Sequence, residues 1–402
     1  MRVSVIVVSR NRDNDLKRLL ALLKYQQGIS FDLIVVTNTS QRDVASFLGG
    51  SSAKYVFCDT ANISIMRNIG LSVSQTELVA FIDDDAIPEP DWLLHLIEPL
   101  AQSGTVSATG PVMTHTGTSL HYGVTWSDLD GVDVSHDAPP KEVVHLHQQA
   151  GKFPRAQGCN VAYVREALEH IGRFDPQFAY YLDETDVSLR LAKAGNTLGF
   201  APRAIVQHLS ASNETRSATR RPTSWTLIGQ SIDHFTRKHC QNPQSAKRKH
   251  FKAFENRLLR ALGHGFLEPR DVTKLRRQLA TAAPSQPMSV PDIEMEQLGH
   301  RDFMDAPRDD DRISVVFSSH DSQNAMDEAK QAIRAGKVVY LFEVESTFSR
   351  HHRVSDGQFY HYHVGRFRSP SGSWRFGSVE AARAKTITEY DLEHKFDELV
   401  LK

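Results

Sequence analysis

The stretch ELVAFIDDDAIPEPDWLLHL, residues 77–96, decides the fold. Its apolar run, residues 78–82, predicts a strand buried on both faces, and this strand ends abruptly on Asp83, Asp84 and Asp85. Asp is a poor strand residue and adjacent carboxylates repel one another, so the cluster needs a physical reason. One interpretation is that the acids cap the helix expected to begin near Asp91. The other is that they hold a cation.

The sequence on the N-terminal side of this stretch alternates between strands and helices. Such alternation predicts an α/β fold with a mostly parallel, Rossmann-like central sheet. Ligands bind at the carboxyl ends of the strands in such sheets, and both the aspartates and the segment Ser9-Arg10-Asn11 follow a strand directly. The strands are expected at residues 3–8, 31–38 and 77–82, and the helices at residues 13–27 and 63–75.

The composition is that of a globular protein of more than one domain. With 402 residues the chain exceeds what one compact core usually holds, and its net charge of −1 argues against nucleic acid as a partner of the whole chain. Three widely spaced cysteines do not form a disulfide framework, so we expect a reducing, cytoplasmic location. No apolar run reaches about 18 residues, and the apolar N-terminal run is too short for a signal peptide.

Charge divides the rest of the chain into segments. Residues 214–277 contain 15 Lys and Arg against 5 Asp and Glu, whereas residues 284–312 contain 8 acidic against 3 basic residues. The basic segment either contacts anionic lipid headgroups or forms helices that pack the domains together, and we favour the second interpretation. Peripheral contact with the inner face of a membrane and homo-oligomerisation are left open. We expect an N-terminal domain (1–212), a basic helical extension (213–282), an acidic Pro-rich linker (283–312) and a small C-terminal α/β domain (313–402).

Two groups of polar residues carry candidate chemistry. Asp-x-Asp at a strand end suits Mg²⁺ or Mn²⁺, which prefer oxygen ligands and often bind substrate phosphates as well. Asp183, Glu184 and Asp186 stand at the start of an expected helix. They either favour the helix dipole or include a general base. His208 follows an expected strand and could complete a metal site with Asp85.

In order and spacing, these pieces resemble glycosyltransferase family 2, which has the A-type nucleotide-sugar transferase fold. The resemblance covers about residues 1–210. The matching segments are VSVIVVSRNRDNDLKRLLALL, DLIVVTNTS, MRNIGLSVSQTELVAFIDDDAIPEPDWL, GCNVAYVREALEHIGRFDPQFAYYLDETDVSLRLAKAG and FAPRAIVQH.

The resemblance implies roles for single residues. Asp85 and His208 would bind the divalent ion, Mn²⁺ or Mg²⁺, and Asp83 would meet the nucleotide. Asp84, between them, faces away or supports the loop. Glu184 would be the catalytic base and Asp183 an acceptor-binding or supporting acid. The residues placed at the donor are Ser9, Arg10, Asn38, Arg67, Asn68, Asp83 and Asp84.

The resemblance also implies an activity: inverting, metal-dependent transfer of one sugar from a nucleotide-sugar donor to a glycan or lipid-linked acceptor, as in bacterial surface polysaccharide synthesis. Two departures matter. Thr37 replaces an aspartate of the family's second strand, which weakens a simple uridine assignment, and the acid pair is Asp-Glu rather than Glu-Asp. The Gln-x-x-Arg-Trp motif of processive members is missing. The alternatives are a sugar-nucleotide-binding scaffold without catalysis and a sugar-1-phosphate nucleotidyltransferase. The second alternative would require a glycine-rich loop after the first strand, and the sequence has no glycine there.

Two further features stay ambiguous at the level of sequence. Three arginines after His208 either form a loop over the donor phosphates or belong to a solvated loop. In the C-terminal domain, His361 and His363 would share one face of a strand, which suits a metal site, but neither a cysteine nor an acid is placed with them in sequence. The three arginines are Arg216, Arg220 and Arg221.

Overall fold

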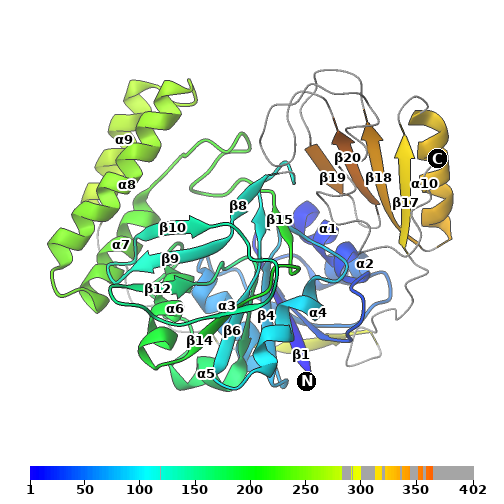
Figure 1. Cartoon of the computed structure of the whole chain (residues 1–402), viewed down its shortest axis with the longest axis horizontal. Coiled ribbons are helices and arrows are strands. Elements are labelled where there is room, and N and C mark those ends of the chain that lie inside the picture. Colours follow the sequence, from blue (N-terminus) through cyan, green and yellow to red (C-terminus); the bar gives the residue numbers. More distant parts are fainter. Residues whose placement is uncertain are drawn as a thin grey trace.

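The computed structural model describes residues 1–117, 119–282, 291, 293–299, 313–318, 322–335, 337–344, 352–355 and 359–364. Over these residues the chain has a mixed α/β architecture built on one large sheet (Figure 1). This confirms the predicted fold class.

Nine of the described strands form the central sheet, in the order β11-β14-β6-β13-β4-β1-β2-β3-β16. The strands β1 to β4, β6 and β14 run in one direction, whereas β11, β13 and β16 run in the other. The sheet is therefore mostly parallel, with the doubly wound order β3-β2-β1-β4 at its centre. Its strands are β1 (Val3–Ser9), β2 (Asp32–Thr37), β3 (Ala53–Phe57), β4 (Leu78–Asp83), β6 (Thr105–Thr109), β11 (Val144–Leu146), β13 (Val161–Val164), β14 (Thr197–Phe200) and β16 (Met295–Leu298).

Helices cover both faces of this sheet because its strands are apolar on both sides. In β1, Val5 and Val7 pack in one core cluster while Ile6 packs in the other. The first cluster includes α1 (Asp13–Leu23), α2 (Gln41–Leu48) and α4 (Trp92–Ile97), which the 3-10 helix η1 (Glu98–Ala101) follows. The second includes α3 (Ile63–Val73), α5 (Arg165–His170) and α6 (Asp183–Lys193).

Two smaller sheets lie beside the central one. The first has the order β10-β9-β12, and the second has the order β5-β15-β7-β8, in which β15 pairs with the strand that follows the aspartates. Their strands are β5 (Ala86–Pro88), β7 (Val112–Met113), β8 (Leu120–Tyr122), β9 (Val124–Asp128), β10 (Asp133–Asp137), β12 (Lys152–Arg155) and β15 (Val206–His208).

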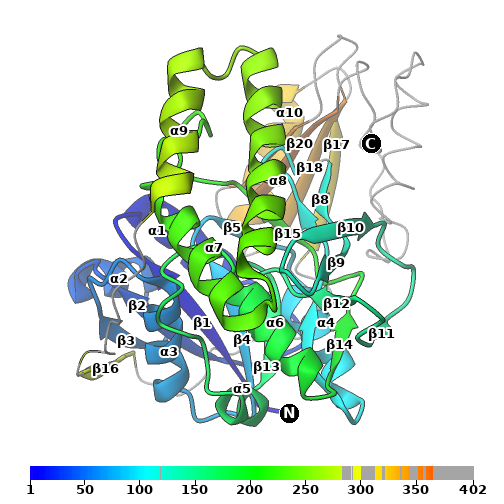
Figure 2. The same cartoon turned by 90° about the vertical axis from the view of Figure 1, so that its left-hand side faces the viewer.

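The basic segment is helical, as expected: it forms α7 (Thr226–His239), α8 (Pro243–Gly263) and α9 (Pro269–Thr281). Figure 2 shows α8 and α9 side by side as a hairpin that extends away from the central sheet. Buried residues of the three helices, among them Phe235, Phe254 and Leu275, share one apolar cluster with Leu189 of α6. The apolar side of the hairpin thus packs within the protein. None of the helices in the described ranges combines the length and the apolarity needed to cross a bilayer.

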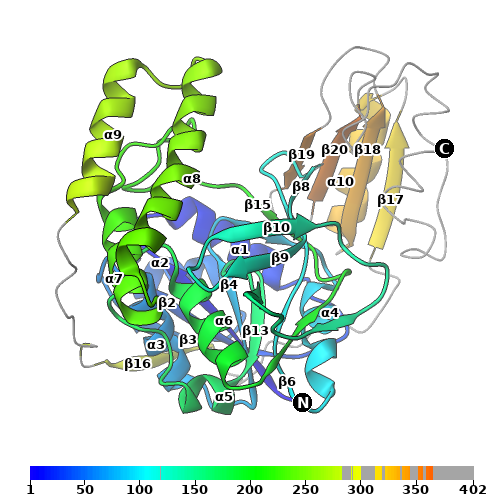
Figure 3. The same cartoon turned by 60° about the vertical axis from the view of Figure 1, so that its left-hand side comes forward.

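The C-terminal part forms its own sheet, in the order β17-β18-β20-β19, beside one helix. It stands on the other side of the molecule from the α8–α9 hairpin (Figure 3). The elements are β17 (Ile313–Ser318), α10 (Ser322–Arg334), β18 (Val338–Val344), β19 (His352–Ser355) and β20 (Phe359–Val364).

One strand lies within the segment expected to be a linker. Residues 283–312 were expected to form a linker, but residues 295–298 form β16, which pairs antiparallel with β3 at the edge of the central sheet. Backbone pairing with an exposed edge, rather than composition, decides the structure of this segment. The remaining residues of the acidic block lie largely outside the described residues.

Candidate functional site

A cavity of about 510 Å³ opens where β1, β4 and β15 end. Its walls bring together residues predicted from separate parts of the sequence, namely Ser9, Arg10, Asp83–Asp85 and His208. This is the carboxyl edge of the central strands, where parallel sheets bind ligands. A volume of this size lies within the usual range for small-molecule and cofactor pockets.

Asp85 and His208 face each other at the base of this cavity. His208 Nε2 lies 3.1 Å from Asp85 Oδ1 and 3.9 Å from Asp83 Oδ2. Asp85 Oδ1 is buried and accepts no hydrogen bond of acceptable geometry. A buried carboxylate oxygen and an imidazole nitrogen 3.1 Å apart, with a second aspartate beside them, form the kind of ligand set that a divalent cation satisfies. The residues present therefore fit the predicted metal site.

The pKa values of this pair reflect mutual attraction. Burial by itself would raise the pKa of Asp85, but the charges of His208 and Arg12 outweigh it and hold the pKa below its ordinary value. Burial would likewise lower the pKa of His208, yet the Asp85 carboxylate reverses this and raises it. The aspartates thus create a potential that favours positive charge at this point.

Asp84 plays a different part from its neighbours. Its Oδ2 accepts a 2.7 Å hydrogen bond from Ser9 Oγ, and its Oδ1 accepts one of 2.7 Å from Arg12 Nη1. Burial raises the pKa of Asp84 to about 7, against the opposing charge of Arg12. Asp84 therefore ties β4 to the loop after β1, as expected of a supporting residue, and the Ser9 hydroxyl is engaged in the same contact.

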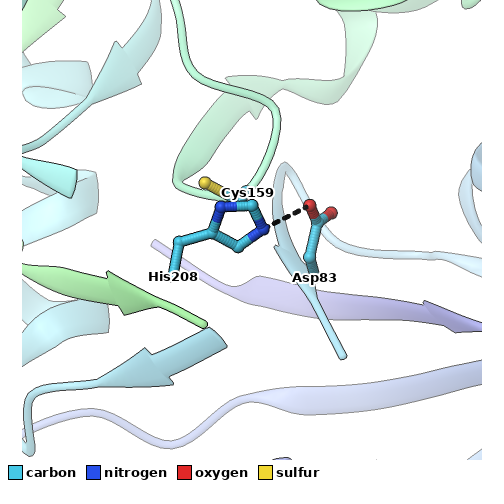
Figure 4. Close-up of side chains that lie close together, drawn as sticks. All are labelled: Asp83, Cys159 and His208. Atoms are coloured by element: carbon cyan, nitrogen blue, oxygen red, sulfur yellow. Dashed lines mark ion pairs between the residues drawn. The ribbon is translucent and has the colours of Figure 1, made fainter. Parts of the chain in front are cut away.

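Cys159 lies beside Asp83 and His208, although the sequence did not single it out. Ligand atoms of Asp83, Cys159 and His208 lie within 4.8 Å of one another, as Figure 4 shows for the three side chains. Burial, followed by the charges of Asp83 and Asp85, raises the pKa of Cys159 well above its ordinary value. A neutral thiol is a poor ligand for Mg²⁺ or Mn²⁺, so Cys159 is better described as a buried neighbour of the site that does not line the cavity.

Arg67 joins the aspartate cluster to the acids of α6. This buried guanidinium contacts Asp183 through Nη1, while Nη2 lies 3.3 Å from Asp83 Oδ1 and donates to the Gly158 carbonyl at 3.1 Å. A Cβ at Gly158 would lie only 3.0 Å from Nη2, so a larger residue would crowd the guanidinium. Arg67 does not line the cavity itself but lies between the two groups of acids.

The backbone before α6 is arranged unusually. Tyr181 and Leu182 both adopt positive φ angles, of 73° and 65°, although neither is glycine. Such conformations cost of order 1–3 kcal/mol each and cluster at functional sites. Here they turn the chain so that Asp183 and Glu184 begin the helix directly behind the aspartate cluster.

The two acids of this pair have distinct surroundings. Burial, and then the neighbouring Glu184 carboxylate, raises the pKa of Asp183. The Glu184 side chain is 20% exposed, and its Oε1 lies 3.2 Å from Arg155 Nη1. Arg155 in turn holds Asp133 through two contacts of 2.9 Å. Glu184 is thus the more accessible acid, oriented by an arginine that has a second partner.

Asp186, the third acid of the helix, has a structural role. Its buried carboxylate contacts Arg190, Lys238 and His239 at 2.5, 2.8 and 2.7 Å. These contacts connect α6 to α7. They explain the presence of Asp186 without assigning it a role in the chemistry.

The remaining donor-site predictions divide into two groups. Arg10 lies at the cavity and contacts Asp59, whose carboxylate also accepts a 2.9 Å hydrogen bond from Asn38. Asp59 thereby supplies a carboxylate at the carboxyl edge of the sheet, where Thr37 stands in place of the family's aspartate. Asn68 does not line the cavity: its amide donates to the Phe174 carbonyl at 2.7 Å and accepts from the Phe174 N–H at 3.0 Å. These two bonds fix a turn.

The arginines after His208 also separate. Arg216 lines the cavity and reaches within 3.9 Å of Asp85 Oδ2. Arg221 lies 3.9 Å from Asp271 and lines a different cavity together with residues of α9. Arg220 lines neither cavity. Only one of the three is placed where a donor phosphate could meet it.

Three residues important to this geometry could not be found from the sequence: Arg12, Arg155 and Cys159. No local pattern singles out any of the three side chains, and each becomes informative only through partners far away in the chain. Arg12 meets Asp84 across 72 positions, and Arg155 meets Glu184 across 29.

Comparison with known proteins gives the following relatives. The succinoglycan biosynthesis protein ExoM of Rhizobium meliloti is 28% identical over 200 residues, covering 47% of this chain and 60% of that protein. The chondroitin synthase of Escherichia coli is 26% identical over 274 residues, covering 59% of this chain and 39% of that one. The chain thus spans less than two thirds of the length of each of these relatives.

Solved structures resemble the chain only distantly. A mannosyltransferase from Pyrobaculum calidifontis in complex with GDP-Man and Mn²⁺ is 14% identical, covers 70% of this chain and 85% of its own, and gives a TM-score of 0.43. A TM-score this low carries no argument about this protein.

The family comparison is more specific. Residues 4–172 match the model of Glycosyl transferase family 2. That range contains the strands and helices that carry Arg10, Arg67 and Asp83–Asp85, and it ends before α6 and β15. Over these residues, fewer than half of the 402, the chain is therefore similar to glycosyltransferase family 2.

Proposed function

We propose that this protein is an inverting glycosyltransferase that moves one sugar from a nucleotide-sugar donor to a hydroxyl of a glycan or lipid-linked acceptor. Arg67 carries the proposal, because its guanidinium contacts both Asp83 of the aspartate cluster and Asp183 of the acid pair. The cation-binding cluster and the acid pair that includes the candidate base Glu184 thus lie one side chain apart. Transfer to a hydroxyl needs both groups at such close range.

The donor would lie in the cavity at the strand ends. A divalent ion, Mn²⁺ or Mg²⁺, would be held by Asp85 and His208 with Asp83 beside them, and when bound it supplies positive charge against the diphosphate leaving group. Arg216 adds a fixed positive charge at the same wall. Arg10 and Asp59 are placed to meet the nucleoside, at the edge between β1 and β3.

Glu184 would act as the base. Its carboxylate takes the proton of the acceptor hydroxyl while that oxygen forms a bond to the anomeric carbon, and the bond to the nucleoside diphosphate breaks on the opposite face. Arg155 orients Glu184 through the contact at Oε1. Asp183 stays paired with Arg67 and supports the helix end. Because α6 and β15 lie beyond the family match, the roles of Glu184 and His208 rest on this geometry.

The relatives indicate the class of acceptor. Two of them are named for succinoglycan biosynthesis and chondroitin synthesis, which supports a glycan acceptor and polysaccharide biosynthesis. The non-catalytic scaffold remains the competing proposal. It predicts donor binding without turnover, whereas the sugar-1-phosphate nucleotidyltransferase predicts pyrophosphate release from a nucleoside triphosphate.

One experiment separates these proposals. Nucleoside diphosphate release is measured across a panel of nucleotide sugars, with Mn²⁺, with Mg²⁺ and with chelator, for the wild type and for E184Q. A glycosyltransferase releases nucleoside diphosphate from one donor class in a metal-dependent manner, and E184Q loses this turnover while still binding donor. Donor binding without any release would support the scaffold. Release without metal would contradict the roles given to Asp85 and His208.

Contact with a membrane is supported by one further observation. Leu259 and Phe266, in the α8–α9 hairpin, are 62% and 57% exposed, and Arg257 and Arg260 lie close to Leu259 in the sequence. Flotation with anionic liposomes at low salt tests the contact, with L259S/F266S as the variant that should abolish it. If the wild type does not float, the proposal fails.

A further inference from the structure

A second cluster of metal-ligating side chains lies in the C-terminal sheet. The parallel register of β18 and β20 pairs Leu341 with His361 and Glu343 with His363. His361 Nε2 lies 2.9 Å from Glu343 Oε2, and His363 Nδ1 lies 3.2 Å from the same oxygen. One ligand atom from each of the three residues lies within 4.8 Å of the others. The acid that the sequence did not place with the two histidines is therefore supplied by the neighbouring strand.

The spacing of these atoms suits one small ion. Ligand atoms about 2.0–2.1 Å from a tetrahedral zinc ion lie roughly 3.3 Å from one another. The two nitrogen–oxygen distances, 2.9 and 3.2 Å, are close to that separation. The imidazole rings are also near neighbours, with centroids 3.9 Å apart, because residues two apart in a strand project from the same face. Little rearrangement is needed to point all three groups at one centre.

The type of ligand distinguishes this cluster from the first site. Two imidazoles and one carboxylate form a set that transition metals prefer, whereas Mg²⁺ seeks oxygen ligands. Two histidines and one glutamate are also a known ligand set of open zinc sites, which keep a position for water. The side chains of Glu343, His361 and His363 are 19%, 12% and 22% exposed, so an ion can reach them.

The position in the sheet separates the cluster from the catalytic domain. Val339 and Leu341, on the same face of β18 as Glu343, pack against Ala325 and Ala329 of α10. The opposite face carries Tyr340, whose hydroxyl donates to Glu89 of the N-terminal domain. The cluster thus lies on the side of the sheet that faces away from Glu89, and it shares no residue with the first site.

We propose that Glu343, His361 and His363 form a binding site for a transition-metal ion of the Zn²⁺ type. The ion would link β18 to β20 and stabilise the C-terminal sheet, because a metal that binds only the folded state adds its binding free energy to stability. The site is independent of the proposed transfer chemistry.

Zinc titration of the full chain tests this proposal. Chelator-treated protein is titrated with Zn²⁺ by calorimetry in excess Mg²⁺, so that the oxygen-rich first site is occupied. The wild type should bind one zinc ion that H361Q/H363Q loses or binds at least about tenfold more weakly. The matched control is H145Q/H147Q, which removes another pair of histidines two residues apart, whose Nδ1 atoms contact the hydroxyls of Thr105 and Thr197. This control should keep wild-type zinc affinity.

Two further variants, E343Q and H208Q, make the outcome of the zinc titration unambiguous. E343Q leaves both imidazoles in place and removes only the carboxylate. If H361Q/H363Q does not fold, the zinc affinity of E343Q is compared with that of the wild type instead, and it should be weaker. Zinc should also raise the Tm of the wild type but not that of E343Q or H361Q/H363Q. Equal zinc affinity in the wild type, E343Q and H361Q/H363Q would overturn the proposal. A zinc signal that disappears only in H208Q would overturn it as well, by assigning the ion to the first site.

Discussion

Arg353 and Glu89, 264 positions apart in the chain, form a buried ion pair in which Nη1 lies 2.6 Å from Oε1. The second carboxylate oxygen of Glu89 accepts a 2.7 Å hydrogen bond from the Tyr340 hydroxyl. The guanidinium also lies over Tyr360, 4.4 Å from the ring centroid. Glu89 directly follows β5, the strand that continues from the aspartate cluster. The C-terminal sheet is therefore anchored to the segment that carries the candidate metal ligands.

Loss of the Arg353 side chain should destabilise the protein substantially. R353M leaves the Glu89 carboxylate buried beside a neutral residue, and breaking such a pair costs about 3–5 kcal/mol. Chemical denaturation measures the change, and the double variant E89M/R353M should recover much of it. The control is K330M, which removes an exposed pair with Asp327 and should cost less than about 1 kcal/mol. An R353M protein as stable as the wild type would show that the pair does not anchor the sheet.

Removal of the proposed base should separate binding from turnover. E184Q keeps the shape of the side chain, and Arg155 retains its two contacts with Asp133, so the fold should survive. We expect transfer to fall by about 10²–10⁴-fold with donor affinity nearly unchanged. Single-turnover assays and donor titration measure the two quantities. D183N is the comparison: it leaves buried Arg67 without its closest partner and should lose stability as well as activity. Near-normal turnover in E184Q would refute the assignment of the base.

Two of the three adjacent aspartates, Asp84 and Asp85, should give different phenotypes. D85N should weaken metal-dependent donor binding by at least about tenfold, because it removes a candidate ligand, and H208Q should do the same. D84N instead disturbs the contacts with Ser9 and Arg12, so its main effect should be a lower Tm. Donor binding measured by calorimetry with and without Mn²⁺, beside thermal unfolding, distinguishes them. If D84N abolishes donor binding while its Tm is unchanged, Asp84 contacts the donor rather than supporting the loop.

Asp186 should make the stability depend on pH. Burial opposes ionisation of this carboxylate, but its bond to His239 and the charges of Arg190 and Lys238 lower its pKa to about 2. The pKa of Asp186 in the folded state is below that of an unfolded aspartate, about 3.9. The contribution of the ionised carboxylate to the free energy of unfolding is therefore complete at pH values above about 3.9. It is lost as the pH falls from about 4 to 2.

The variant D186N tests this contribution. It should be less stable than the wild type at pH 7, by on the order of 2 kcal/mol. The difference in unfolding free energy should shrink as the pH is lowered from 5 toward 2, which urea denaturation at several pH values measures. A difference that stays constant over this range would contradict the ionic role of Asp186.

The sequence alone determined the α/β pattern, because strands buried on both faces appear as continuous apolar runs and helices as apolar repeats at helical spacing. It also located the cluster Asp83–Asp85 at a strand end, the acids at the start of α6, and His208 at the end of β15. These are local signals. Each depends on a few adjacent residues, so each could be read without knowing what lies opposite.

The tertiary structure decided what depends on pairing between distant segments. It assigned Asp84 to Ser9 and Arg12, Asn68 to the Phe174 backbone, and Asp186 to the helix α7. It placed β16 at the sheet edge within a segment whose composition indicated a linker. It brought Glu343 to the two histidines of β20 by strand register. Whether a carboxylate binds a ligand or supports the fold depends on its partners, and partners up to 264 positions away are fixed only when the chain is folded.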